Sequence, residues 1–171
     1  EEEFLLIFND HWASQVLENL VERSNDRQIR YLFSKCITRF YILSTGKSSS
    51  FVLQKMIKSI PKIYVHDQQI NEEEKDEEKK DEEEVPSIQK IIETMEKELH
   101  KKWIDLLSHP NGCFIVRSFI EALASEDVYE FKILKKVVKT ILKSPKMKAW
   151  ISDNVISPTL TVCILFHFFL L

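Results

Sequence analysis

Three short segments of this chain place polar side chains at the same spacing, and these side chains are the candidates for chemistry. Each segment begins with two small residues, continues with a variable residue, two aliphatic residues and a polar residue, and ends on an apolar pair. We call the second to sixth residues of each segment a pentad; the three pentads are Ser14–Glu18, Ser50–Gln54 and Cys113–Arg117. Their first and fifth side chains can donate or accept hydrogen bonds, which is the chemistry of a binding surface.

Helix geometry predicts which pentad residues reach a ligand. At about 100° per residue, the first, fifth and second residues of a pentad fall near 0°, 40° and 100°, whereas the third and fourth fall near 200° and 300°. We therefore expect an exposed polar edge with an apolar side buried behind it. The expected edge comprises Ser14, Gln15, Glu18, Ser50, Phe51, Gln54, Cys113, Phe114 and Arg117. The expected buried side comprises Val16, Leu17, Val52, Leu53, Ile115 and Val116.

Other arrangements that could support chemistry fail on spacing. The tripeptide Gly46-Lys47-Ser48 is like the end of a phosphate-binding P-loop, but Tyr41 stands where that motif needs its earlier glycine. The five histidines show no metal-ligand spacing with cysteines or carboxylates, and we expect them to be surface or cap residues. No nucleophile stands in a recognisable relation to a base. The sequence therefore predicts no enzyme activity, no metal, no cofactor and no small-molecule substrate.

The cysteines and the apolar C-terminal stretch bear on compartment and membrane. Cys36, Cys113 and Cys163 are an odd number without short spacing, and each lies in an apolar helical pattern. We expect three free, buried thiols in a reducing compartment. The apolar stretch 160–171 is 12 residues long, too short for a helix to span a bilayer, and the start of the chain is not that of a signal peptide. We expect no membrane association.

The elements that must position the pentads are helices. The chain has only two glycines and five prolines in 171 residues, and few runs of alternating apolar residues. This composition predicts an all-α protein. From Ser14 to Ser50 is 36 residues, and from Ser50 to Cys113 is 63. An internal repeat of about 36 residues, with an insertion of about 27 before the third copy, predicts an α-solenoid that is a fragment of a longer array.

A run of charge marks the insertion. Residues 72–84 carry ten acidic residues and three lysines, a net charge of −7, so the rest of the chain sums to +4. Such a segment has too little apolar surface to fold, and we expect disorder across the whole insertion. The expected domains are the first two repeats at 1–66, the acidic disordered insertion at 67–86, and the third repeat with a degenerate partial fourth at 87–171.

Cap and breaker residues set the expected helix bounds. Asp10, Ser87 and Ser125 are plausible N-caps, Gly46 a C-cap, and Pro61 and Pro145 breakers. One side of the helix that ends near Lys143 carries a stripe of lysines, Lys132, Lys135, Lys136, Lys139 and Lys143, which is either solvated or in contact with phosphates. The expected helices span roughly 11–23, 27–43, 48–59, 87–107, 110–120, 126–143, 146–156 and 158–171, and residues 4–8 are expected to end a short helix. In the last of them, Thr161–Leu165 takes the place of a pentad.

The pentads resemble those of the Pumilio-type (PUF) RNA-binding repeats, a right-handed α-solenoid of three-helix repeats similar to armadillo arrays. The resemblance rests on 11–18, 46–54 and 109–117 and covers about three repeats. It implies that the pentads line a concave face, that their first and fifth side chains address base edges, and that their second side chains stack between bases. Ser14 with Glu18 resembles a guanine-type pair and Ser50 with Gln54 an adenine-type pair; Cys113 with Arg117 is nonstandard, nearest to a cytosine reader. Phe51 and Phe114 could stack, whereas Gln15 departs from the pattern.

Irregular spacing and the acidic insertion are more similar to the nucleolar Pumilio-like branch than to cytoplasmic mRNA regulators. That branch binds precursors of small-subunit rRNA. The resemblance therefore implies single-stranded RNA, precursor rRNA in particular, and pre-ribosomal proteins as partners, and the nucleolus or nucleus as the location, with the cytoplasm as the alternative. The alternative function is a HEAT- or armadillo-like scaffold that binds a protein on the same face.

Overall fold

The computed structural model describes residues 2–73, 85–128 and 131–169, and within them every regular element is a helix. Each expected repeat begins with a short helix and continues with a longer one that carries the pentad. The helices are α1 (Glu2–Asn9), α2 (His11–Arg23), α3 (Asp26–Cys36), α4 (Phe40–Thr45), α5 (Ser49–Lys58), α6 (Ile60–Glu73), α7 (Ile88–Leu99), α8 (Trp103–Leu107), α9 (Gly112–Leu123), α10 (Phe131–Leu142), α11 (Met147–Ile151) and α12 (Ser157–Phe169).

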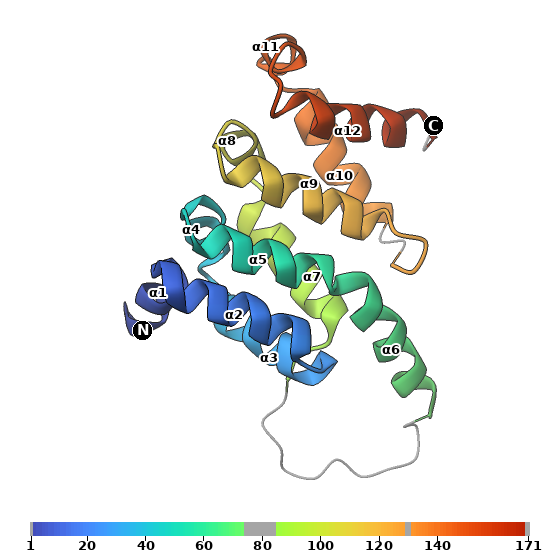
Figure 1. The fold of residues 1–171 in the computed structure, drawn as a ribbon. Helices are drawn as coiled ribbons and strands as arrows, with labels where there is room; N and C mark the ends of the chain where they lie inside the picture. Colours follow the sequence, from blue (N-terminus) through green and yellow to red (C-terminus); the bar gives the residue numbers. More distant parts are fainter. Residues whose placement is uncertain (1, 74–84, 129–130, 170–171) are drawn as a thin grey trace.

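The helices stack as a solenoid of repeats. Helices α2, α5, α9 and α12 lie side by side in one layer, each in contact with the next (Figure 1). The short helices α4, α8 and α11 pack against α5, α9 and α12, respectively, and α1 packs against α2. Behind this layer, α7 packs on α3 and α4, and α10 packs on α8, α9 and α12. The all-α solenoid predicted from the sequence is confirmed.

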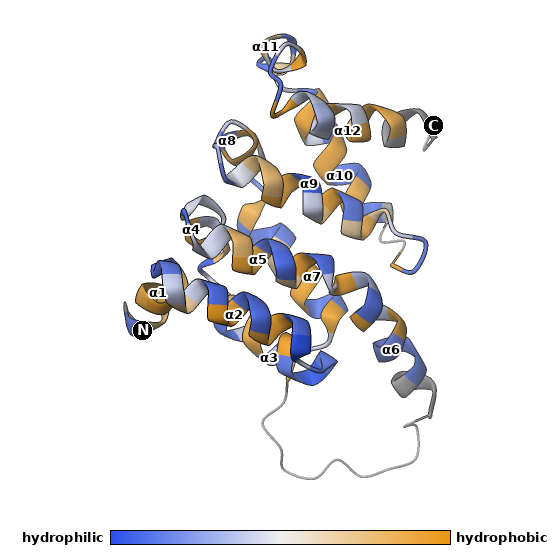
Figure 2. Cartoon of the chain, in the orientation of Figure 1, coloured by the Kyte–Doolittle hydropathy of each residue, from blue (hydrophilic) through white to orange (hydrophobic). Residues whose placement is uncertain are grey.

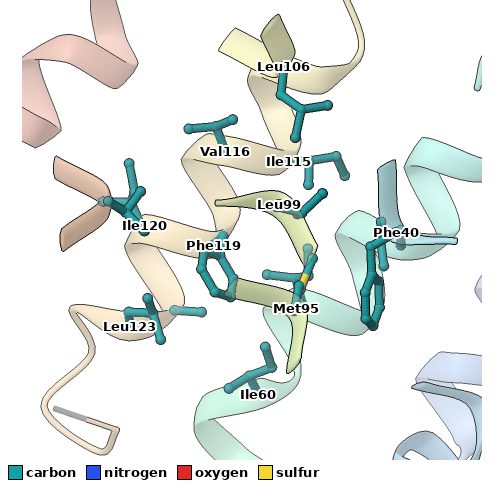
Figure 3. Packing of buried hydrophobic residues seen from close by; sticks show 14 of the residues in the cluster. Phe40, Ile60, Met95, Leu99, Leu106, Ile115, Val116, Phe119, Ile120 and Leu123 are labelled. Carbon is teal, nitrogen blue, oxygen red and sulfur yellow. The ribbon is translucent and has the colours of Figure 1, made fainter. Parts of the chain in front are cut away.

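The core lies between the two layers. Figure 2 shows apolar and polar residues alternating along the helices of both layers. Phe40 of α4, Met95 and Leu99 of α7 and Phe119 of α9 meet there, and all four are fully buried (Figure 3). The ring of Phe119 stacks on the indole of Trp103 with centroids 5.3 Å apart. Aromatic stacking of this kind adds about 0.5–1.5 kcal/mol to the burial of apolar area.

Side-chain caps begin α2 and α7 as expected, whereas the expectation of a helix from 126 after Ser125 was wrong, since residues 126–128 form a turn and α10 is Phe131–Leu142. The carboxylate of Asp10 accepts the N–H groups of Trp12 and Ala13 and so begins α2. Ser87 accepts the N–H of Lys90 at the start of α7. Gly46 follows α4, where an added Cβ would lie within 2.5 Å of the Asn9 side-chain oxygen, so only glycine fits without a shift.

Two helices expected to be continuous are broken, and those expectations were wrong. The expected helix 27–43 is α3 and α4, with Thr38 at φ 71° between them. The expected helix 87–107 is α7 and α8. The apolar period runs through each break, so periodicity could not reveal it. The breaks let the short helices turn and bury Phe40 and Trp103, respectively, in the core.

The N-terminal bound of the insertion was also wrong, because α6 continues to Glu73. Asp67, 6% exposed, has a reason to be ordered. Its Oδ2 accepts the N–H of Ile88 at 2.9 Å, and its Oδ1 lies 3.4 Å from Nη1 of Arg30. Asp67 thus joins α6 to α3 and to the start of α7. Within the rest of the expected disordered run, residues 74–84 lie outside the described residues.

Val16 was expected to be buried and is 66% exposed. Its counterparts Val52 and Ile115 are fully buried. The difference follows from position in the stack, since α2 covers α5 and α5 covers α9, while no described helix covers the corresponding side of α2. The same open side exposes Leu20.

No helix among the described residues is long and apolar enough to cross a membrane.

Candidate nucleic-acid interface

The second residue of each pentad lies on the surface. Phe51 is 56% exposed and Phe114 40% exposed, and Gln15 is exposed as well. Large aromatic side chains are usually buried in helical proteins, so two at equivalent positions on adjacent helices form a surface feature. Helix geometry predicted this exposure, and the prediction is confirmed.

The first residue of each pentad is buried, contrary to the expected exposed edge. Ser14, Ser50 and Cys113 are only 2%, 5% and 2% exposed. The hydroxyl of Ser14 donates to the carbonyl of His11 at 2.9 Å, and the thiol of Cys113 donates to the carbonyl of Pro110 at 3.3 Å. These residues are small because neighbouring helices approach one another there. A single-helix projection places them on the polar side but cannot include the adjacent helix.

The fifth residues connect one repeat to the next. Gln54 Nε2 donates to Ser118 Oγ on α9 at 3.1 Å. Arg117 Nε donates to Thr159 Oγ1 at 3.1 Å, and Arg117 Nη2 donates to the carbonyl of Val155 at 3.0 Å. Gln54 and Arg117 are therefore half-buried at the seams between repeats, outside the apolar core. Glu18 is half-buried too, beside the loop that precedes α5.

A cleft of about 220 Å³ lies between α2 and α5, where the structure brings the first pentad together with the second. Ser14, Gln15 and Glu18 line it from one side and Phe51 from the other. The arrangement offers a hydrogen-bonding edge beside an aromatic face. His11, Lys47 and Ser48 also line this cleft, and the sequence analysis missed them as binding residues. Their nearness to the pentads in the chain was the available signal.

A second cleft, of about 270 Å³, lies at the other end of the row, between the α8–α9 turn and the α11–α12 turn. Phe114 forms part of its wall, and the guanidinium of Arg117 lies 5.7 Å from the centre of the Phe114 ring on the same helix. Cys113, His109 and Asp153 also line it. Sequence reasoning missed Asp153 because it belongs to the following repeat and lies 36 residues beyond Arg117.

The fourth pentad was assigned one residue too late. In α5 and α9, two buried residues precede the exposed second residue of the pentad. The same pattern in α12 is Thr159 and Leu160, both buried, followed by exposed Thr161. The equivalent pentad is therefore Leu160–Ile164, and Thr159 occupies the place of Ser49 and Gly112.

The three cysteines are buried and free, as expected. Burial raises the pKa of the Cys36 thiol far above its usual value and that of Cys163 to about 12. Burial also raises the pKa of Cys113. None of the three is suited to act as a nucleophile. Among the described residues, no group of three His, Cys, Asp or Glu side chains could hold a metal ion.

The solenoid of three-helix repeats, the exposed aromatic residues and the clefts at the seams agree with the Pumilio-type resemblance, and comparison with known proteins tests that resemblance directly. A family profile described as "NOP9-like PUF repeat domain" matches residues 3–161. The protein named Nucleolar protein 9 of Clavispora lusitaniae (strain ATCC 42720) is 23% identical over 152 residues. That alignment covers 84% of this chain but 21% of the relative, so the chain spans about a fifth of its length. No solved structure gives a significant match. The family profile extends over nearly all of the chain, which therefore belongs to the NOP9-like PUF repeat family.

Proposed function

We propose that this chain binds single-stranded RNA along the row formed by α2, α5, α9 and α12. The proposed contact residues are the exposed Gln15, Phe51 and Phe114, the half-buried Glu18 and Gln54, and His11 and Lys47. RNA binding is the expectation for a PUF repeat family, in which unpaired bases meet side chains of successive helical repeats. The protein acts by holding RNA, without a catalytic step of its own.

The main support for the proposal is the position of the exposed Phe51 ring beside a cleft. Its ring is exposed on α5 and lines a cleft whose opposite side is formed by Ser14, Gln15 and Glu18. A base stacked on Phe51 would present its edge to the carboxylate of Glu18, an acceptor suited to the N–H groups of guanine. At the next seam, the Gln54 amide donates to Ser118, which leaves its carbonyl oxygen to accept from the amino group of adenine.

The biological setting is part of the same proposal. The relative named Nucleolar protein 9 supports a nucleolar location, and we propose a role in ribosome assembly there. The proposed ligand is an unpaired segment of small-subunit rRNA precursor, and the proposed further partners are pre-ribosomal proteins. We also propose the division into two repeats, an insertion, and a third repeat with a degenerate partial fourth. The second repeat then extends to Glu73, where α6 ends.

Replacing Phe51 by alanine tests the proposal. Loss of one base–aromatic stack removes about 1–3 kcal/mol, so RNA affinity should fall about 5- to 150-fold. Because Phe51 is exposed, the melting temperature should change little. Affinity is measured by fluorescence anisotropy with a single-stranded RNA selected from a random pool, and stability by thermal melting.

The matched control is Ile42→Ala, which removes a similarly exposed apolar side chain (50%) from α4 without touching either cleft. It should leave affinity unchanged. An intact Phe51→Ala protein that binds RNA as well as the wild type would contradict the proposal and favour a protein-binding scaffold.

A further inference from the structure

The third repeat presents an aromatic ring to a base but has no free pentad side chain to read that base. Cys113 is buried, and its thiol donates to the Pro110 carbonyl. Arg117 Nε donates a hydrogen bond to Thr159, and Arg117 Nη2 donates one to the carbonyl of Val155. These bonds hold α9 to the α11–α12 turn and to α12. A base stacked on Phe114 must therefore be recognised by other residues.

We propose that a nucleobase stacked on Phe114 enters the 270 Å³ cleft beside it and is read by Asp153 and His109. This inference rests on the proposed function and assigns a base-binding site outside the pentad positions. The cleft is smaller than the roughly 300–1,000 Å³ sites of drug-sized ligands, which suits a single base. Pro110, Val155 and Ile156 give it apolar walls for a planar ring.

His109 is fixed as a hydrogen-bond donor. Its Nδ1 accepts the N–H groups of Asn111 and Gly112, at 3.2 and 3.3 Å, and so begins α9. In the neutral imidazole one nitrogen accepts and the other carries the proton. The network therefore places the proton on Nε2, which donates to a base carbonyl.

Asp153 is fixed as an acceptor. Its Oδ1 accepts the N–H groups of Val155 and Ile156, at 2.8 and 3.0 Å, which holds the carboxylate in place before α12. Its Oδ2 accepts no hydrogen bond from the described residues, and the residue is exposed. A carboxylate oxygen held in this way favours a ligand with an N–H group at its edge.

Guanine fits this pair best. Its N1–H and N2–H groups adjoin one another and suit the carboxylate of Asp153, while O6 beside them suits the Nε2–H of His109. Uracil offers one N–H group at this edge, and cytosine and adenine present an unprotonated ring nitrogen where guanine has N1–H. The site thus favours guanine at the third repeat, in place of the cytosine that the Cys113–Arg117 pair would suggest.

The test uses two variants that keep the backbone bonds, of which Asp153→Asn is isosteric and His109→Asn shortens the side chain. Asp153→Asn retains Oδ1 as the acceptor for Val155 and Ile156 but replaces Oδ2 by an NH₂ donor. His109→Asn retains an acceptor close to the place of Nδ1 and removes the Nε2–H. The matched control is Asp105→Asn, which makes the same change of charge at an exposed site on α8 that does not line the cleft.

The full-length protein and each variant are used to select from a random 12-nucleotide single-stranded RNA pool, and the bound RNA is sequenced. We expect the wild type and Asp105→Asn to enrich guanine at one position that both cleft variants lose. At that position, replacement of guanine should cost the wild type about 5- to 150-fold in affinity, the range for one good base contact, and cost Asp153→Asn far less. Melting curves confirm that each variant is folded.

Three outcomes would overturn the inference. If both cleft variants keep the wild-type preference at every position, the cleft does not read a base. If Arg117→Ala changes the base preferred at this repeat while Asp153→Asn does not, the pentad reads it. If the wild type enriches no RNA, the proposed function fails together with the inference. If only Phe51→Ala loses its base preference, the proposed RNA binding at the cleft between α2 and α5 holds, but the cleft beside Phe114 does not read a base.

Discussion

At the scale of single residues, Glu98 links protonation to the fold. Its Oε2 accepts the N–H of Thr38 at 2.9 Å and its Oε1 accepts the N–H of Tyr41 at 3.3 Å, at the start of α4. Burial raises the pKa of the Glu98 carboxyl above its usual value, and the backbone N–H groups act in the opposite direction. The carboxylate thus holds a helix start at a cost in desolvation.

This shift gives the stability a defined pH dependence. A carboxyl with a raised pKa binds its proton more tightly in the folded state, so its contribution to stability is present below about pH 4.3 and is lost as the pH rises through the folded pKa. The free energy of unfolding of the wild type, minus that of Glu98→Gln, should therefore decrease as the pH rises through the folded pKa of Glu98. Urea denaturation at a series of pH values measures it, and a constant difference would contradict the prediction.

Residue types and helix geometry were enough to predict that Phe51 and Phe114 are exposed. They were not enough to predict that Ser14, Ser50 and Cys113 are buried, because that depends on how closely the adjacent helix approaches. They also could not show that Gln54 and Arg117 reach across the seams. Asp153 was beyond sequence reasoning, since only the stacking of α12 on α9 brings it beside Phe114.

At the scale of elements, α10 carries the strongest charge of the described helices. The stretch 131–152 contains seven lysines and no acidic residue. Lys132, Lys139 and Lys143 are exposed, and the apolar side of α10 packs on α8, α9 and α12. Lys136 pairs with Glu96 of α7 at 3.0 Å. The exposed lysines therefore point away from the row of pentads. They can contact only an RNA that is long enough to extend beyond that row.

We expect these lysines to contact phosphates of a long RNA. For single strands, each phosphate contact contributes about 0.7 to the slope of log affinity against log salt concentration. Lys132→Gln, Lys139→Gln and Lys143→Gln together should reduce the slope by about 2 for a 30-nucleotide RNA. A triple variant of equal charge, Lys62→Gln, Lys90→Gln and Lys97→Gln, is the control. Equal slopes in the two triple variants would show that the α10 stripe is only solvated.

Helix ends marked by caps were predictable, and breaks within an apolar period were not. Asp10 and Ser87 predict the starts of α2 and α7, respectively, because each is a short polar residue that precedes an apolar pattern. Nothing comparable marks the end of α3, where Cys36 and Phe40 continue the helical spacing across the break. The break depends on Glu98, which is 60 residues away from Thr38 in the chain.

At the scale of the whole molecule, stability depends on each repeat covering the next. Leu20, Met56 and Phe119 occupy equivalent positions, yet Leu20 is 54% exposed and the other two are fully buried. In a stack, a side chain is buried only where a neighbouring repeat lies against it. The open side of α2 could not be predicted from the sequence, because its apolar pattern is that of a covered helix.

Leu20 and Met56 therefore form a matched pair for measuring the coupling between repeats. In this 171-residue chain, Met56→Ala should cost about 2–5 kcal/mol of unfolding free energy, because it leaves a cavity between α2 and α5. Leu20→Ala should cost about 0.5 kcal/mol or less, as is usual for surface substitutions. Urea unfolding of both variants measures the difference. Equal losses would mean that the exposed side of α2 is covered in solution.

The hydrogen bond between Asp67 and Ile88 has a consequence for how this solenoid tolerates inserted residues. Asp67 and Ile88 are 21 positions apart in the sequence, and a 2.9 Å hydrogen bond joins them. The ends of whatever connects α6 to α7 are thus fixed by the folded repeats themselves. For a flexible connection between fixed ends, doubling the length costs only about 0.6 kcal/mol. A reporter domain or a protease site could therefore be spliced in here with the stacking of α5 on α9 left intact.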